Sequence, residues 1–173
     1  LTTKPLDPPS EQLQPITDLY IQGQFQQALS HTTEMLERFP SSAFLHNISG
    51  ASNAGLMQFD AAISSYKQAL RINPNYVEVY NNMGIVLNDK GNPEDAIGSY
   101  KKALQIQPNF AEVHNGMGIA LKNAGEPKAA IDSYQVALRI KPDYAEAHNN
   151  LGAILVDLGR LPEAEVSYRQ AIE

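Results

Sequence analysis

The sequence predicts an all-α protein, an α-solenoid of about five stacked antiparallel helix pairs. The first observation is a period of 34 residues, which links Pro40, Pro74, Pro108 and Pro142. The same period links two further columns: Gly50, Gly84, Gly118 and Gly152, and Tyr66, Tyr100, Tyr134 and Tyr168. Within each period apolar residues follow helical spacing twice, and a turn divides the two runs.

We number each repeat so that its last proline is position 32. The chain then divides into a proline-rich tail at 1–8 and repeats at 9–42, 43–76, 77–110, 111–144 and 145–173. We expect a first helix, helix A, at about positions 2–14 and a second, helix B, at about positions 17–30. Position 15 is glycine in four repeats, where a helix ends and the left-handed conformation costs least without a Cβ. Pro93, Pro127 and Pro162 suit the first turn of helix B.

The first and last repeats differ from the internal ones. Repeat 9–42 has Pro15 in its first helix and Thr32 where the others have tyrosine, so it is predicted to be a divergent capping repeat. We expect Pro15 to interrupt the first helix. The last repeat is typical of an internal one, and its helix B would leave Val166, Ala171 and Ile172 partly uncovered. We therefore expect either that the natural chain continues beyond Glu173 or that another molecule covers this face.

The columns resemble the tetratricopeptide repeat (TPR) pattern over about residues 9–173. The motif residues in repeats 3, 4 and 5 are Tyr80, Met83, Gly84, Leu87, Ala96, Tyr100, Ala103 and Pro108; His114, Met117, Gly118, Leu121, Ala130, Tyr134, Ala137 and Pro142; and His148, Leu151, Gly152, Leu155, Ala164, Tyr168 and Ala171. The resemblance implies a right-handed superhelix with a concave groove lined by the A helices. We expect Gly at position 8 and Ala at position 20 to let the two helices of a repeat approach, and Tyr at position 24 to fill the wedge between repeats.

Composition excludes several classes of function. Thirteen Lys and Arg against nineteen Asp and Glu give a net charge of −6, which argues against a nucleic-acid-binding protein. No stretch approaches the ~18 consecutive apolar residues of a membrane span. The absence of cysteine excludes disulfides, thiolate zinc sites and a cysteine nucleophile. It leaves the cellular compartment open, with the cytoplasm as a default expectation.

No motif predicts catalysis, a metal site or a cofactor. His46, His114 and His148 occupy position 4, the bulky packing position, so we interpret them as packing residues and not as metal ligands. Neither the glycines at 50–55 nor Gly116 and Gly118 complete a phosphate-binding or dinucleotide-binding motif. We therefore expect no enzymatic activity, no metal and no cofactor.

By the same resemblance, positions 2, 5, 6, 9, 12 and 13 of helix A face the groove. Residues predicted to line it are Asn47, Glu78, Asn81, Asn82, Asn88, Glu112, Asn115, Lys122, Glu146, Asn149 and Asn150. This set is similar to the asparagine ladders of TPR arrays attached to O-linked N-acetylglucosamine transferases. Amides both donate and accept, so they suit a peptide backbone of any sequence. The lysine and arginine clamp that some TPR domains use for a C-terminal carboxylate is absent at these positions, while Lys67, Lys101, Arg71, Arg139 and Arg169 lie on helix B.

These features predict a non-catalytic protein-interaction scaffold that binds an extended, neutral or basic peptide segment. Two alternatives stay open. The chain is the recruitment arm of a larger glycosyl- or sulfo-transferase, or it forms homo-oligomers through its uncovered C-terminal repeat. The identity of the partner is not encoded in any motif that we find.

Overall fold

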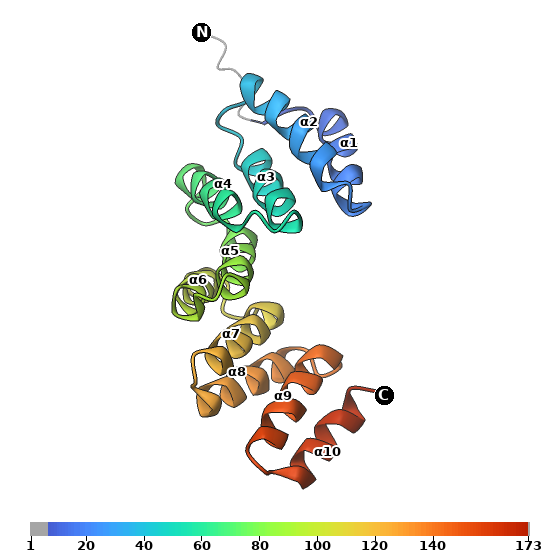
Figure 1. Cartoon of the computed structure of the whole chain (residues 1–173), viewed down its shortest axis with the longest axis vertical. Helices are drawn as coiled ribbons and strands as arrows, with labels where there is room; N and C mark the ends of the chain where they lie inside the picture. The colour runs from blue at the N-terminus through green and yellow to red at the C-terminus, as the bar shows by residue number, and fades with distance from the viewer. Residues whose placement is uncertain (1–6, 173) are drawn as a thin grey trace. The chain divides into compact units, whose positions relative to one another are not determined.

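The computed structural model describes residues 7–172, and in these residues all regular structure is α-helical. Short turns join the helices in chain order (Figure 1). The ten helices are α1 (Ser10–Ile21), α2 (Phe25–Arg38), α3 (Ala43–Gly55), α4 (Phe59–Ile72), α5 (Val77–Asp89), α6 (Pro93–Ile106), α7 (Ala111–Asn123), α8 (Pro127–Ile140), α9 (Ala145–Asp157) and α10 (Leu161–Gln170). Odd-numbered helices are thus the A helices and even-numbered ones the B helices. The residues form two compact units. The first unit ends at Val86 and the second begins at Leu87, so the division lies inside α5.

Each helix pair turns at a residue with positive φ. At position 15 the four glycines have φ between 73° and 88°, and repeat 2 has Met57 there with φ of 57°. A side chain in this conformation brings its Cβ close to the backbone carbonyl and costs about 1–2 kcal/mol. Met57 is exposed, so packing of its side chain offsets little of that cost.

Met57→Gly is therefore expected to raise the free energy of unfolding by about 0.5–1 kcal/mol, because relief of the strained backbone exceeds the entropy that glycine adds to the unfolded chain. Urea unfolding monitored by circular dichroism measures the change. Met57→Ala serves as the control, since it removes the same side chain but keeps the Cβ, and should leave stability nearly unchanged. Equal stabilisation by both variants would contradict the backbone explanation.

Glycine at position 8 lies directly beneath the tyrosine at position 24 of its own repeat. A Cβ built on Gly50 would lie 2.5 Å from the ring of Tyr66, and one on Gly118 would lie 2.5 Å from the ring of Tyr134. The tyrosine at position 24 also reaches the following repeat, because a Cβ on Gly116 would lie 2.8 Å from the Tyr100 ring. The tyrosine ring thus packs both within its own repeat and against the following repeat. The prediction that it fills the wedge between repeats included only the second of these contacts.

The first helix is continuous through Pro15, so the expectation of an interruption was wrong. Proline removes one helical hydrogen bond, to the carbonyl of Glu11 four residues earlier. Both residues are exposed, so water can bind that carbonyl. Ile16 holds the helix in place, because it is buried in a cluster with Leu45 and Ile48 of α3.

The predicted tail falls partly outside the described residues, which begin at Asp7. Asp7 and Pro8 pack against the fold: the hydroxyl of Ser42 donates to the Asp7 carboxylate, and Pro8 is buried. Ser42 in turn caps α3 by accepting from the backbone N–H of Leu45. The last part of the predicted tail therefore helps to order the start of α3.

Three histidines at position 4 bind the chain to the preceding turn. The Nε2 atoms of His46, His114 and His148 lie 3.1, 2.9 and 2.8 Å from the carbonyl oxygens of Pro40, Pro108 and Pro142. A carbonyl only accepts, so each Nε2 carries the hydrogen. This contact is a structural role, in agreement with the packing interpretation.

Candidate functional site

In each unit, the side chains at positions 2, 5, 6, 9, 12 and 13 of the A helices form a surface that we call the A face. Its polar groups pair across neighbouring A helices at a separation of 35 residues. Asn82 donates to Asn47 at 3.3 Å and Asn150 donates to Asn115 at 2.9 Å. Farther along the helices Asn123 donates to Asn88 at 2.9 Å, and Lys122 pairs with Asp157 at 3.0 Å. Since the repeat is 34 residues, each group meets the position one step further along the next helix.

Asn115 is the centre of a polar cluster in the unit that begins at Leu87. Its Nδ2 donates to Oε1 of Glu146 at 3.0 Å, and its Oδ1 accepts from Asn150. The Tyr144 hydroxyl completes the cluster at 3.5 Å from Asn115 Nδ2 and 3.4 Å from Glu146 Oε2. Burial, followed by the carboxylates of Glu146 and Glu112, raises the pKa of Tyr144 to about 12, so its hydroxyl stays protonated at neutral pH.

The same residue types recur 68 positions earlier, in the unit that ends at Val86. Asn47 accepts from Asn82 and is hydrogen-bonded to the hydroxyl of Tyr76, close to the Glu78 carboxylate. Burial raises the pKa of Tyr76, the carboxylates of Glu78 and Asp7 add to this, and the hydrogen bond with Asn47 opposes it. Each unit therefore contains one Asn-Tyr-Glu-Asn cluster.

The repeat between these two clusters lacks two of the four residue types. The residue corresponding to Tyr76 and Tyr144 is Phe110, and that corresponding to Asn82 and Asn150 is Gly116. Gly116 instead lies against the ring of Tyr100. No amide therefore stands 35 residues after Asn81.

The structure divides the eleven predicted groove residues into three groups. Asn115 is 2% exposed and its amide is engaged at both ends, so it supports the cluster and offers little to a ligand. The half-buried residues are Asn47, Asn81, Asn82, Asn88 and Asn150, and the exposed ones are Glu78, Glu112, Lys122, Glu146 and Asn149.

The A face carries more basic charge than the sequence columns indicated. Lys122 neutralises Asp157, and Lys141 lies 3.7 Å from Glu112 Oε1 and 4.9 Å from the ring centroid of Tyr144. Sequence reasoning missed Lys141, Tyr76 and Tyr144, because they follow helix B and precede the next helix A. Tyr76 and Tyr144 are 68 residues apart, which is two repeat lengths, and this spacing could have identified them from the sequence.

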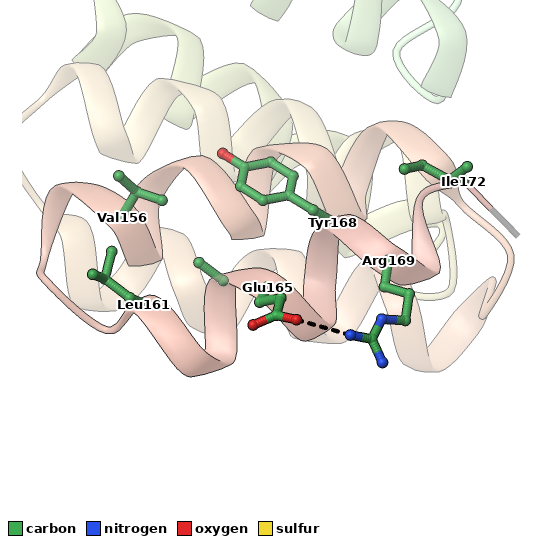
Figure 2. A pocket seen from close by; sticks show the side chains of 7 residues that line it. Val156, Leu161, Glu165, Tyr168, Arg169 and Ile172 are labelled. Atoms are coloured by element: carbon green, nitrogen blue, oxygen red, sulfur yellow. Dashed lines mark hydrogen bonds and ion pairs between the residues drawn. The ribbon is translucent and has the colours of Figure 1, made fainter.

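A second surface lies on the outer side of α9 and α10 (Figure 2). Val156 of α9 and Leu161 and Tyr168 of α10 line it, together with Ile172. Tyr168 is 37% exposed, whereas its equivalents Tyr66, Tyr100 and Tyr134 are at most 2% exposed. Val166 and Ile172 are exposed and Ala171 is half-buried, as predicted for the last repeat.

Residues 7–172 show neither a metal-binding cluster nor a membrane-spanning helix. Residues 7–172 contain no group of three or more His, Cys, Asp or Glu side chains that could hold a metal ion. No helix in that range is both long enough and apolar enough to cross a bilayer.

Comparison with family models agrees with the repeat geometry. A TPR repeat model matches residues 58–91 and 123–159, and a tetratricopeptide repeat model matches residues 77–110. The chain belongs to the tetratricopeptide repeat proteins. The TPR fold indicates a protein-interaction scaffold.

One curated relative of this TPR protein is the probable UDP-N-acetylglucosamine–peptide N-acetylglucosaminyltransferase SEC of Arabidopsis thaliana. It is 34% identical over 76 residues, which are 44% of this chain and 8% of that protein. The chain thus resembles a small part of that transferase, and the array resembles those of its family.

Solved structures show the same fold. PilF of Pseudomonas aeruginosa matches 94% of this TPR protein and 74% of its own chain, with a TM-score of 0.86 and 21% identity. A thermophilic TPR protein of Thermus thermophilus matches 94% and 89%, with a TM-score of 0.78 and 24% identity. YrrB, described as a TPR protein with an unusual peptide-binding site, matches 91% and 81%, with a TM-score of 0.71 and 21% identity.

Proposed function

We propose that this TPR protein binds an extended, neutral or basic segment of a partner protein along the A face. The observation that carries the proposal is the duplicated Asn-Tyr-Glu-Asn cluster, centred on Asn47 in one unit and on Asn115 in the other. The cluster holds amide and carboxylate groups in defined orientations at the surface. Such groups bind the N–H and C=O groups of an extended backbone without selecting its side chains.

The hydrogen-bonding capacity of the amides supports this proposal. An asparagine side chain has two donor hydrogens and two acceptor lone pairs, and a single pair such as Asn82 with Asn47 uses only one of each kind. The residue 35 positions after Asn81 is Gly116, which offers no amide side chain, and Asn149 is exposed. We therefore assign backbone contacts to Asn81 in one unit and to Asn149 in the other, and an orienting role to Asn115.

The charge of the A face favours a basic ligand. Glu78, Glu112 and Glu146 are exposed at position 2 of successive A helices, and Lys141 offsets part of the charge of Glu112. Exposed charges are screened over about 8 Å at physiological salt, so the attraction should weaken as salt rises.

A peptide array probed with the purified chain tests this proposal at low and at physiological salt. Basic extended peptides should bind best at low salt, and Asn81→Ala combined with Asn149→Ala should weaken binding about tenfold or more, since each lost hydrogen bond is worth about 0.5–1.5 kcal/mol. The triple variant Glu78→Gln, Glu112→Gln and Glu146→Gln should lose the preference for basic peptides.

Asn109→Ala is the matched control, because Asn109 is exposed in the turn between α6 and α7 and off the A face. It should bind as the parent does. Equal binding by the Asn81 and Asn149 double variant and by the control would move the site away from the A face. No binding of any peptide would reject the proposal.

A second candidate function is recruitment for a larger enzyme of the glycosyl- or sulfo-transferase type. It is favoured by the similarity to the SEC transferase, of which this chain covers a small part. The complete reading frame tests it. A transferase domain in the same frame would support this role, and a stop codon shortly after Glu173 would reject it.

A third candidate is self-association through the outer side of α9 and α10, with a second copy of the chain as the occupant. Leu161 and Ile172 are 61% and 87% exposed beside the ion pair of Glu165 with Arg169. The face therefore carries one charge of each sign next to apolar side chains. A two-fold axis would place Glu165 of one copy opposite Arg169 of the other, which is the self-complementary arrangement of a symmetric dimer.

Sedimentation velocity over a range of concentrations tests the third candidate. Leu161→Glu with Ile172→Glu should abolish a concentration-dependent increase in mass, because it places unpaired charge in the apolar contact. Gln170→Glu is the control, since Gln170 is exposed on α10 but does not line this surface. A parent chain that stays monomeric at every concentration would reject self-association.

A further inference from the structure

A small apolar hollow lies beside the pair of Asn47 and Asn82, in the unit that ends at Val86. Its volume is about 160 Å³. It is lined by the aromatic residues Tyr20, Phe25 and Tyr66, by Ile85 and Val86 of α5, and by the polar side chain of Asn82. Ile85 is 45% exposed although it lines this hollow.

The hollow exists because repeat 2 has small residues where repeats 3 and 4 have larger ones. Positions 9, 12 and 13 hold Ala51, Ala54 and Gly55, and all three line the hollow. The same positions hold Ile85, Asn88 and Asp89 in repeat 3, and Ile119, Lys122 and Asn123 in repeat 4. A Cβ on Gly55 would lie 2.5 Å from the ring of Phe25, so glycine is also required for the aromatic wall to take its place.

We infer that this hollow is a side-chain subsite of the A face, which takes one leucine-sized apolar side chain of the bound segment. The inference rests on the proposed peptide-binding function and adds a sequence requirement to it. An apolar cavity of about 150 Å³ holds one six-membered hydrocarbon ring, so this hollow accommodates a single leucine, isoleucine or methionine side chain. Asn82, at its edge, stands where the backbone of that residue would pass.

The surrounding groups also give the register of the bound segment. Glu78, Asn82 and Ile85 follow one another on the same side of α5, at the i, i+4 and i+7 spacing. Glu78 and Ile85 are therefore about 10 Å apart along the helix axis, and an extended peptide advances about 3.3 Å per residue. A ligand running along α5 should carry its basic residue about three positions from its apolar residue.

The experiment is a titration of the purified chain with acetylated serine-glycine heptapeptides, followed by the methyl NMR signals of Ala51, Ala54 and Ile85. The first peptide carries leucine and, three residues away, lysine. The second has serine in place of the leucine, and the third has glutamine in place of the lysine. The first should bind at least about tenfold more tightly than the second, because only the first of these two buries a leucine side chain. The first and the third peptides both carry leucine and should both shift the three sets of methyl signals, and the third should bind more weakly than the first.

Ala54→Leu should fill the hollow and remove the advantage of the leucine peptide. The substitution is compatible with the helix, because position 12 holds Val156 in the last repeat. Ala61→Leu is the matched control, since Ala61 is exposed on α4 of the same unit and does not line the hollow. It should leave the tenfold difference unchanged.

The outcomes separate this inference from the function on which it rests. If all three peptides bind equally to the parent and to Ala54→Leu, the A face binds peptides but the subsite is rejected. If no peptide binds, both are rejected. Methyl signals of Ala51 and Ile85 that change with protein concentration alone would assign the hollow to a second copy and overturn the inference.

Discussion

Gly118→Ala is expected to lower the free energy of unfolding by about 1–3 kcal/mol, although alanine is the better helix former, because the added methyl group overpacks the core. The new Cβ would lie 2.5 Å from the ring of Tyr134. That ring is 1% exposed and surrounded by packed side chains, so it has no free space into which to move. Urea unfolding measures the loss as a shift of the midpoint at unchanged slope.

Gly98→Ala is the matched control for this prediction. Gly98 lies inside α6, is exposed, and has no atom within 4 Å of the place where a Cβ would stand. The same substitution should therefore raise stability by about 0.5–1 kcal/mol, because glycine costs more backbone entropy than alanine. Opposite signs at the two sites would support the close contact of glycine with tyrosine, and stabilisation at both would refute it.

Asn115→Ala is expected to lower the free energy of unfolding by about 1–3 kcal/mol. The substitution removes a buried amide that accepts a hydrogen bond from Asn150 and donates one to Glu146. The hydrogen bond that Asn115 donates to the Tyr144 hydroxyl lowers the pKa of Tyr144, so its loss should also raise that pKa. Thermal unfolding and ultraviolet titration of tyrosine measure the two effects.

The control is Asn149→Ala, which makes the same change at an exposed position of the same helix-A column. Its stability should stay within about 0.5 kcal/mol of the parent. If Asn115→Ala is as stable as Asn149→Ala, the cluster does not hold neighbouring A helices together, and Asn115 returns to the set of ligand-binding candidates.

Most of the fold follows from periodicity. The helix B bounds in repeats 1 to 4 coincide with positions 17–30, and the A helices begin one position earlier than expected in repeats 2 to 5. A repeated spacing such as that of glycine at position 8 can be recognised in a single sequence, because the same contact between glycine and tyrosine recurs from repeat to repeat. Pro15 is the exception: its cost depends on whether solvent reaches the carbonyl of Glu11, which sequence pattern does not report.

The candidate site was only half predictable. The spacing placed Asn47 beside Asn82 in one unit and Asn115 beside Asn150 in the other, yet the same repeat position holds both buried and exposed asparagines. Asn115 is buried because its neighbours Tyr144 and Glu146 close over it. Asn81 at the same position is more exposed, and the corresponding neighbour in sequence is Phe110.

The sequence by itself determined the helices and the order of the repeats, because these depend on spacing along the chain. The tertiary structure decided which amides pair, which carboxylates meet lysine, and where the hollow beside Asn82 opens. The physical reason is the offset of one position between neighbouring A helices. That offset results from the packing of whole helices against each other, so no single column of the repeat contains it.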